Sequence, residues 1–266
     1  MGTRRRLDAE LVRRGLARSR EHAAELVTVG RVLVAGQVAG KPATQVAPDD
    51  SIAIRELPGM PDYASRGGRK LAGALAAFPG LTVAGRRCLD AGASTGGFTD
   101  VLLRAGAAHV VAVDVGYGQL AWRLRSDPRV SVLDRVNVRQ LRPEQVAPAP
   151  SLVTADLSFI SLTLVLPALT SCASPDADFV LLVKPQFEVG KGRVGAGGVV
   201  RDPGLRAAAV AGVADAAAAS GLGVAGIAAS PLPGPAGNVE YFLWLRRGAP
   251  PLDNGQLAAV IAEGPE

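Results

Sequence analysis

The segment most suited to binding a ligand is the turn Asp90–Phe98, whose sequence is DAGASTGGF. This turn follows the apolar pair Cys88–Leu89 and precedes residues 99–103, whose apolar side chains have helical spacing, so it joins a strand to a helix. Glycines in such a turn let a ligand approach the backbone, and the first amides of the helix remain free to donate hydrogen bonds. The turn therefore predicts a ligand-binding loop; the alternative is a glycine-rich turn without a ligand.

Two common phosphate-binding patterns do not fit this loop. The dinucleotide fingerprint needs a second glycine where the chain has Ser94, and a P-loop needs Lys and then Ser or Thr where the chain has Phe98-Thr99. What remains is an acid at the strand end, a glycine two positions later and more glycines at the turn. This arrangement resembles the S-adenosylmethionine loop of class I methyltransferases. The resemblance implies cofactor contacts from Asp90, Gly92, Ser94, Thr95, Gly96, Gly97 and Phe98.

The basic residues are mostly arginine, and the lysines among the 29 are Lys41, Lys70, Lys184 and Lys191. A primary amine can lose its proton in a protein whereas a guanidinium cannot, so these lysines are candidates for acid-base chemistry. The chain has only two histidines and two cysteines, which makes a Ser-His-Asp triad or a His/Cys metal site hard to assemble. We therefore expect catalysis by other groups and no metal.

The segment from residue 65 to residue 248 alternates predicted strands and helices. A helix runs from Ser65 through Phe78, and a longer helix runs from Pro203 to Ser220. Strands are predicted at residues 87–89, 110–113, 130–133, 152–154, 179–183, 224–227 and 239–245. This alternation implies an α/β fold with a Rossmann-like, mostly parallel sheet of seven strands, in which ligands bind beyond the carboxyl ends of the strands.

Polar residues follow several of these predicted strands. Asp114 closes the second strand, where an acid commonly holds ribose hydroxyls, and Asn137 follows the third, where a base-edge contact would fit. A capping or surface role is an equal alternative for either residue. Asp156-Leu157 follow the fourth strand and Lys184 follows the fifth. All of them are therefore candidates for one ligand-binding rim.

In class I methyltransferases the last strand runs antiparallel, which would bring Glu240 to this rim, and the helix before the first strand can bring Lys70 there. Lys70, Asp156, Lys184 and Glu240 resemble the Lys-Asp-Lys-Glu tetrad of FtsJ-type ribose 2′-O-methyltransferases, within the motifs SRGGRK, ADLSFIS, VKPQFE and GNVEYF. The resemblance implies that neutral Lys184 takes the proton of a 2′-hydroxyl while the other three orient the reacting groups. The sequence leaves the protonation state of Lys184 open, and the alternative is a structural ion-pair cluster.

The first fifth of the chain carries most of the net charge of +5, with ten basic and six acidic residues between Arg4 and Arg55. We predict two short helices, Leu7–Leu16 and Ser19–Gly30, followed by strands at 32–34, 38 and 52–54. The order of residues 6–55 resembles an S4 RNA-binding domain; the alternative is a helical hairpin whose arginines only keep it soluble. Candidate RNA contacts are Arg4, Arg6, Arg14, Arg18 and Arg20, with Arg66, Arg69, Lys191 and Arg193 further along the chain.

Two further segments shape the expected architecture. Residues 190–198, GKGRVGAGG, combine glycines with two cations and predict a mobile lid that contacts RNA phosphates. We expect an S4-like unit at 1–57, a proline-containing linker at 58–64, a methyltransferase domain at 65–248 and a C-terminal tail at 249–266.

Taken together, the chain resembles the TlyA family, rRNA methyltransferases that have also been called haemolysins. The resemblance implies S-adenosylmethionine-dependent 2′-O-methylation of cytidines in 16S rRNA, 23S rRNA or both, within ribosomal RNA or ribosomal subunits, and an influence on sensitivity to antibiotics such as capreomycin and viomycin. The linker and the tail depart from the family. The rival functions are a non-catalytic RNA-binding or ribosome-assembly protein and a haemolysin acting on membranes.

Composition limits these rivals. The most tempting membrane stretch, Ala207–Ala229, is rich in Ala and Gly and contains Asp215, so we expect no stable membrane insertion. Two cysteines and no stretch resembling a signal peptide favour a reduced, cytoplasmic protein. We expect a monomer or a weak dimer.

Overall fold

The computed structural model describes residues 4–55, 57 and 61–263, except for the side chain of Lys191. Contacts divide the chain into two compact units, Met1–Asp62 and Tyr63–Glu266. The division falls inside the expected linker, of which residues 58–60 lie outside the described part of the chain.

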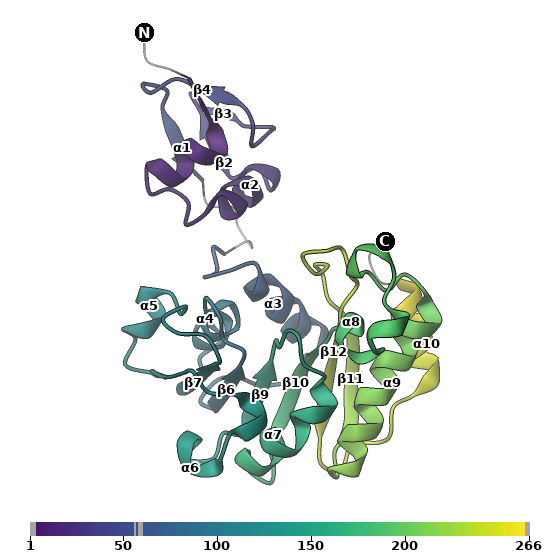
Figure 1. The fold of residues 1–266 in the computed structure, drawn as a ribbon. Coiled ribbons are helices and arrows are strands. Elements are labelled where there is room, and N and C mark those ends of the chain that lie inside the picture. The colour runs from purple at the N-terminus through teal and green to yellow at the C-terminus, as the bar shows by residue number, and fades with distance from the viewer. Residues whose placement is uncertain (1–3, 56, 58–60, 264–266) are drawn as a thin grey trace. The chain divides into compact units, whose positions relative to one another are not determined.

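The N-terminal unit combines two helices with short antiparallel strands (Figure 1). Its elements are β1 (Arg5–Arg6), α1 (Leu7–Arg13), α2 (Arg20–Thr28), β2 (Val32–Val34), β3 (Gln37–Val38), β4 (Gln45–Val46) and β5 (Ile52–Ile54). β1 pairs with β4, and β2 lies between β3 and β5. Leu7, Leu11, Leu26 and Val32 form its core. The predicted helices and the strands β2, β3 and β5 are confirmed, and β1 and β4 add a second small sheet.

Local signals explain where these two helices begin and end. The Ser19 hydroxyl accepts a hydrogen bond from the backbone N–H of His22 (3.2 Å), which caps the start of α2. Gly15 and Gly30 follow the two helices with φ of 70°, the left-handed conformation that commonly ends a helix. Both helices therefore end near the glycines at which the sequence predicts their ends.

The larger unit is built on a sheet of seven strands (Figure 1). The strands are β6 (Arg87–Ala91), β7 (His109–Asp114), β8 (Val130–Asp134), β9 (Leu152–Ala155), β10 (Asp178–Val183), β11 (Gly223–Ala229) and β12 (Tyr241–Arg246). Their order is β11-β12-β10-β9-β6-β7-β8; β12 pairs antiparallel with β10 and with β11, and the other pairs of neighbouring strands are parallel. This confirms the predicted α/β fold and its mostly parallel sheet.

Helices cover both faces of this sheet. The longer ones are α3 (Gly67–Ala77), α4 (Gly97–Arg104), α7 (Leu166–Cys172), α9 (Pro203–Ala219) and α10 (Asn254–Glu263), and the shorter ones are α5 (Trp122–Arg125), α6 (Pro143–Val146) and α8 (Pro185–Glu188). One core joins α3 and α4 to one face of the sheet, and the other core joins α7, α9 and α10 to the opposite face. Because α10 places Leu257 and Ile261 in that second core, the segment expected as a tail contains a packed helix.

The register of the sheet brings the predicted rim together. Ala91 at the end of β6 pairs with Val113 on one side and with Ala155 on the other. Val183 at the end of β10 pairs with Tyr241, the first residue of β12. The carboxyl ends of four parallel strands and the beginning of β12 therefore lie along one edge of the sheet.

Candidate active site

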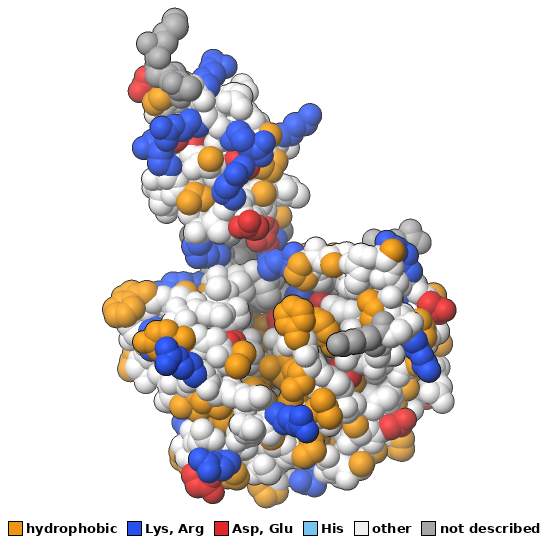
Figure 2. Space-filling view, viewed as in Figure 1, with side chains coloured by type: hydrophobic (Ala, Val, Ile, Leu, Met, Phe, Trp, Pro, Cys, Tyr) orange, Lys and Arg blue, Asp and Glu red, His pale blue; other side chains and the backbone are white. Residues whose placement is uncertain are grey.

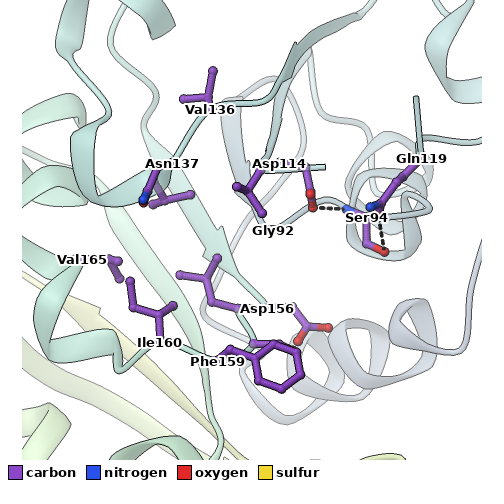
Figure 3. A pocket seen from close by; sticks show the side chains of 14 residues that line it. Gly92, Ser94, Asp114, Gln119, Val136, Asn137, Asp156, Phe159, Ile160 and Val165 are labelled. Carbon is purple, nitrogen blue, oxygen red and sulfur yellow. Dashed lines mark hydrogen bonds between the residues drawn. The ribbon is translucent and has the colours of Figure 1, made fainter. Parts of the chain in front are cut away.

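A cavity of about 480 Å³ lies at this edge of the sheet. It is lined by Gly92, Ser94, Asp114, Val115, Gln119, Val136, Asn137, Val138, Asp156, Leu157, Ser158, Phe159, Ile160 and Val165. Figure 3 shows Ser94, Asp114 and Gln119 together at one side of the cavity, with Asn137, Ile160 and Val165 at another. Apolar walls with a few convergent polar groups are typical of sites for small organic ligands.

Asp114 connects the end of β7 to the glycine-rich turn. Its Oδ2 accepts a hydrogen bond from the backbone N–H of Ser94 (2.8 Å), and its Oδ1 accepts one from the N–H of Gly116 (2.7 Å). Ser94 has φ of 48°, and its hydroxyl donates to Oε1 of Gln119 (3.3 Å), as Figure 3 shows. The predicted ribose-binding acid thus faces the cavity and also fixes the loop beside it.

The glycines of this turn are required by close packing. A Cβ on Gly92, whose φ is 85°, would lie 2.6 Å from the backbone oxygen of Asp156. A Cβ on Gly96, whose φ is 96°, would lie 2.8 Å from the side chain of Leu120. Gly92 and Gly97 line the cavities described here, whereas Gly96 acts as the N-cap of α4.

Asp90 does not line the larger cavity, although the sequence predicts that it contacts the cofactor. It is fully buried, and its Oδ2 accepts a hydrogen bond from the hydroxyl of Thr99 (2.6 Å). Burial raises the pKa of Asp90 to about 7, and the hydrogen bond from Thr99 opposes this shift. Asp90 therefore packs behind the loop, joining β6 to α4.

Asn137 caps a short helix at the wall of the larger cavity, and its contact with a base stays a prediction. It lines the larger cavity, and its Oδ1 accepts a hydrogen bond from the backbone N–H of Arg139 (3.0 Å), at the start of the short helix Val138–Gln140. Its amide group remains beside the apolar residues Val136 and Ile160 of the same cavity.

A second cavity, of about 280 Å³, adjoins the first. It is lined by Ser65, Arg66, Gly67, Lys70, Gly92, Ala93, Ser94, Thr95, Gly97, Phe98, Asp156, Ser158, Lys184 and Pro235. Gly92, Ser94, Asp156 and Ser158 line both cavities. A ligand in the larger cavity and a group in the smaller one would therefore meet beside Asp156.

The four predicted catalytic residues form two ion pairs. Nζ of Lys184 lies 2.6 Å from Oδ1 of Asp156, and it also donates to the hydroxyl of Ser158 (3.0 Å). Nζ of Lys70 lies 2.5 Å from Oε2 of Glu240, and both side chains are at most 5% exposed. Lys70, Asp156 and Lys184 line the smaller cavity, whereas buried Glu240 lines neither. The structure thus places Glu240 behind Lys70, as its counterion.

Several residues that line the cavities were not among the cofactor-binding or catalytic residues predicted from the sequence. Ser65 and Ser158 belong to the motifs that contain Lys70 and Asp156, so their motif membership could have marked them. Gln119 and Pro235 lie in loops that have no periodicity and no motif. Only the folded chain brings these two residues to the cavities.

The residues predicted to contact RNA differ in exposure and in their contacts within the protein. Figure 2 shows Lys and Arg side chains across the visible face of the N-terminal unit. Arg6 and Arg20 are exposed, although both contact Asp8 (2.8 and 3.0 Å). Three more of these arginines are exposed, namely Arg4, Arg18 and Arg193, whereas Arg69 is half-buried. Arg66 lines the smaller cavity and donates a hydrogen bond to the carbonyl of Pro233. The side chain of Lys191 lies outside the described part of the structure.

Arg14 differs from Arg6 and Arg20 because it is half-buried and its guanidinium also bonds to backbone carbonyls. It contacts Glu10 (2.7 Å) and donates to the backbone carbonyls of Asp50 (2.8 Å) and Pro48 (2.9 Å). Hydrogen bonds from Arg13 and Arg14 lower the pKa of Glu10 to about 2. The geometry therefore favours a structural role for Arg14 over the predicted RNA contact.

The glycine-rich segment 190–198 is fixed at its carboxyl end. Oδ1 of buried Asn238 accepts a hydrogen bond from the backbone N–H of Val200 (2.8 Å), and its Nδ2 donates to the carbonyl of Gly198 (2.8 Å). Gly190, Gly197 and Gly198 have φ of 81°, 74° and 78°. These left-handed conformations favour glycine, and the mobility of the segment and its closure over RNA stay predictions.

Within residues 4–55, 57 and 61–263, no group of three or more His, Cys, Asp or Glu side chains is arranged to hold a metal ion. None of the described helices has the length and apolar character needed to cross a membrane.

Comparisons with known proteins agree with this geometry. Residues 63–247 match the FtsJ-like methyltransferase family, and residues 5–52 match the S4 domain. The chain is 63% identical to the 16S/23S rRNA (cytidine-2′-O)-methyltransferase TlyA of Mycobacterium tuberculosis, over 92% of this chain and 91% of that one. It is 37% identical to Hemolysin A of Brachyspira hyodysenteriae, over 89% and 98% of the two chains.

A solved structure also matches along nearly the whole chain. A candidate hemolysin from Streptococcus thermophilus superposes with a TM-score of 0.76 and 37% identity, and the match covers 99% of this chain and 96% of that one. Sequence and fold therefore agree, and the chain belongs to the FtsJ-like methyltransferases, with an S4 domain preceding the catalytic domain.

Proposed function

We propose that this protein transfers a methyl group from S-adenosylmethionine to the ribose 2′-oxygen of a cytidine in ribosomal RNA. The observation that supports this most directly is the Lys184–Asp156 pair, at 2.6 Å, beside the wall that the two cavities share. A class I methyltransferase fold implies the use of S-adenosylmethionine, and the FtsJ-like family supplies the reaction type.

The larger cavity fits an adenosine-containing cofactor. Val115, Val136 and Ile160 offer apolar surface for a purine, and the carboxylate of Asp114 can accept hydrogen bonds from ribose hydroxyls. Gly92 lets the turn after β6 pack against the backbone of Asp156 at the wall of this cavity. S-adenosylmethionine, when bound, supplies a methyl group on an electrophilic sulfonium. We therefore assign the cofactor to Gly92, Ser94, Asp114, Asn137 and Leu157, with Thr95, Gly97 and Phe98 toward the smaller cavity.

The smaller cavity would hold the acceptor ribose. In its neutral form Lys184 can take the proton of the 2′-hydroxyl as the oxygen bonds to the methyl carbon and the carbon–sulfur bond breaks. Asp156 and Ser158 hold the amine at this position, and Lys70 presents a second cation that Glu240 keeps oriented. Lys184 is thus the proposed base, and the other three charged residues position the reacting groups.

The RNA substrate is proposed from the S4 domain and from the activity that the mycobacterial relative is named for. That relative's name gives both 16S and 23S rRNA, so either or both are candidate targets here. Exposed Arg4, Arg6, Arg18 and Arg20 can contact RNA phosphates, as can Arg66, Arg69 and Arg193 of the larger unit. We also propose that loss of this modification changes sensitivity to capreomycin and viomycin.

The test is transfer of radiolabelled methyl from S-adenosylmethionine to 30S subunits, 50S subunits and naked rRNA, with mapping of the labelled nucleotide. Label on a cytidine 2′-oxygen, absent with Lys184→Ala, supports the proposal and identifies the substrate. Binding of cofactor and RNA without any label would favour the rival, a non-catalytic RNA-binding or ribosome-assembly protein.

A further inference from the structure

The two segments that carry the Lys184–Asp156 pair are held together at more than one point. One segment is the loop after β9, residues 156–161, which is followed by the short helix Leu162–Leu164. The other begins at Lys184 and continues as α8. The Lys184 ammonium joins them at one end, through Asp156 and Ser158 (2.6 and 3.0 Å).

Glu188, the last residue of α8, joins the same segments at the other end. Its Oε2 accepts a hydrogen bond from the hydroxyl of Ser161 (2.5 Å), and its Oε1 accepts one from the backbone N–H of Leu162 (2.9 Å). The Ser161 oxygen also accepts from the N–H of Thr163 (3.1 Å), at the start of the short helix. One carboxylate thus secures the end of the loop and the first turn that follows it.

The loop between these two points needs such support. Phe159 has φ of 66°, a conformation that a residue with a bulky side chain adopts only when its surroundings hold it there. Its side chain is 92% exposed, and its ring centroid lies 5.3 Å from that of Phe187, the neighbour of Glu188. Leu157, Phe159 and Ile160 line the larger cavity. Any loosening of the loop would therefore alter the cavity wall.

We propose that Glu188 is a positioning residue for methyl transfer, which holds residues 157–160 in the wall of the larger cavity and keeps Asp156 and Ser158 in place for Lys184. Glu188 itself lines neither cavity, so it acts through the loop. Burial raises the pKa of its carboxyl group, and the bonds from Ser161 and Leu162 offset that cost. The inference rests on the cofactor placement proposed above.

The experiment compares Glu188→Ala and Glu188→Gln in the full chain, with Glu144→Ala, at an exposed glutamate of α6, as the matched control. We measure affinity for S-adenosylmethionine by calorimetry, amide exchange of residues 157–164 without cofactor, and kcat and KM. Glu188→Ala should weaken cofactor binding on the order of tenfold, the effect of losing hydrogen bonds to a charged group. It should also speed amide exchange in the loop and lower kcat.

Glu188→Gln should retain cofactor affinity within about twofold, because an amide can accept from Leu162 and donate to Ser161. If Glu188→Ala does not fold, Ser161→Ala removes one bond and should show a smaller change in the same direction. Unchanged affinity and exchange in the alanine variant, or failure of glutamine to restore them, would overturn the inference. Absence of cofactor binding by the unmodified chain would instead refute the proposed function. The exchange measurement would still test whether Glu188 holds residues 157–164 in place.

Discussion

Nζ of Lys184 lies 2.6 Å from Oδ1 of Asp156. Lys184 follows β10 and Asp156 follows β9, and these two strands are parallel neighbours. The contact therefore depends on strand register rather than on closeness in the sequence. A base and its partner held in this way need little reorganisation when an acceptor hydroxyl arrives.

Lys184→Ala should lower the rate of methyl transfer by about 10²–10⁴-fold, the usual contribution of a positioned base. Lys184→Arg should be comparably slow, because a guanidinium keeps its proton at neutral pH. Single-turnover transfer to rRNA measures both rates, and RNA affinity should stay near that of the unmodified chain. Substantial turnover by the arginine variant would show that Lys184 is not the base.

Glu240→Ala should destabilise the larger unit by about 3–5 kcal/mol, because it leaves Lys70 buried without its counterion. Replacing both residues, as Lys70→Met with Glu240→Leu, should recover much of that loss while activity stays low. Urea unfolding gives the free energies. Arg125→Ala is the control, since its partly exposed pair with Asp134 should contribute less than about 1 kcal/mol.

Gly92→Ala should abolish cofactor binding, because the new Cβ would lie 2.6 Å from the backbone of Asp156 and the φ of 85° is unfavourable for alanine. Gly212→Ala is the matched control: it lies inside α9, and a Cβ there would meet nothing within 4 Å. That change should increase stability by about 0.4–1 kcal/mol. Calorimetric titration and thermal unfolding separate the two effects, and normal cofactor affinity in Gly92→Ala would contradict the assignment.

Asp90 should make the stability of the larger unit depend on pH. Its pKa of about 7 in the folded chain lies above the value of about 4 for an unfolded aspartate, so the folded state binds this proton more readily. Its stabilising contribution is complete below about pH 4 and is lost as the pH rises through about 7. Asp90→Asn should remove this dependence, and melting temperatures between pH 5 and pH 8 would show it. Parallel pH profiles for both proteins would exclude this role.

Arg14→Ala should mainly destabilise the N-terminal unit, because Arg14 bonds to Glu10 and to two backbone carbonyls. Arg4→Ala and Arg193→Ala should instead leave stability unchanged and weaken RNA binding. Each should reduce the slope of log affinity against log salt by about 1 if the residue contacts a phosphate. Filter binding at several salt concentrations, together with thermal unfolding, tests both statements.

Much of the fold follows from the sequence because strand and helix periodicities are local properties. All seven strands of the large sheet lie at predicted positions, and Gly15 and Gly30 end the first helices as their types indicate. The grouping of Lys70, Asp156, Lys184 and Glu240 in one site could be predicted only because four motifs matched a known family. Periodicity alone does not show which residues pair with each other.

The direction in which a side chain points could not be predicted from the sequence. Asp90 ends a strand like Asp114, yet it points into the protein and bonds to Thr99, whereas Asp114 faces the cavity. Arg14 has the same residue type as Arg18, but nearby carbonyl groups occupy it. Gln119 reaches the larger cavity through a loop fold that no spacing rule describes. These directions are set by tertiary packing.

The place of β12 within the sheet has a consequence for synthesis on the ribosome. β12 is the last strand in the chain, yet it lies between β10 and β11 and begins next to Glu240, the counterion of Lys70. In a nascent chain that lacks this strand, one edge of β10 is unpaired and Lys70 has no Glu240 as its counterion. Translation must therefore pass residue 246 before the sheet can close.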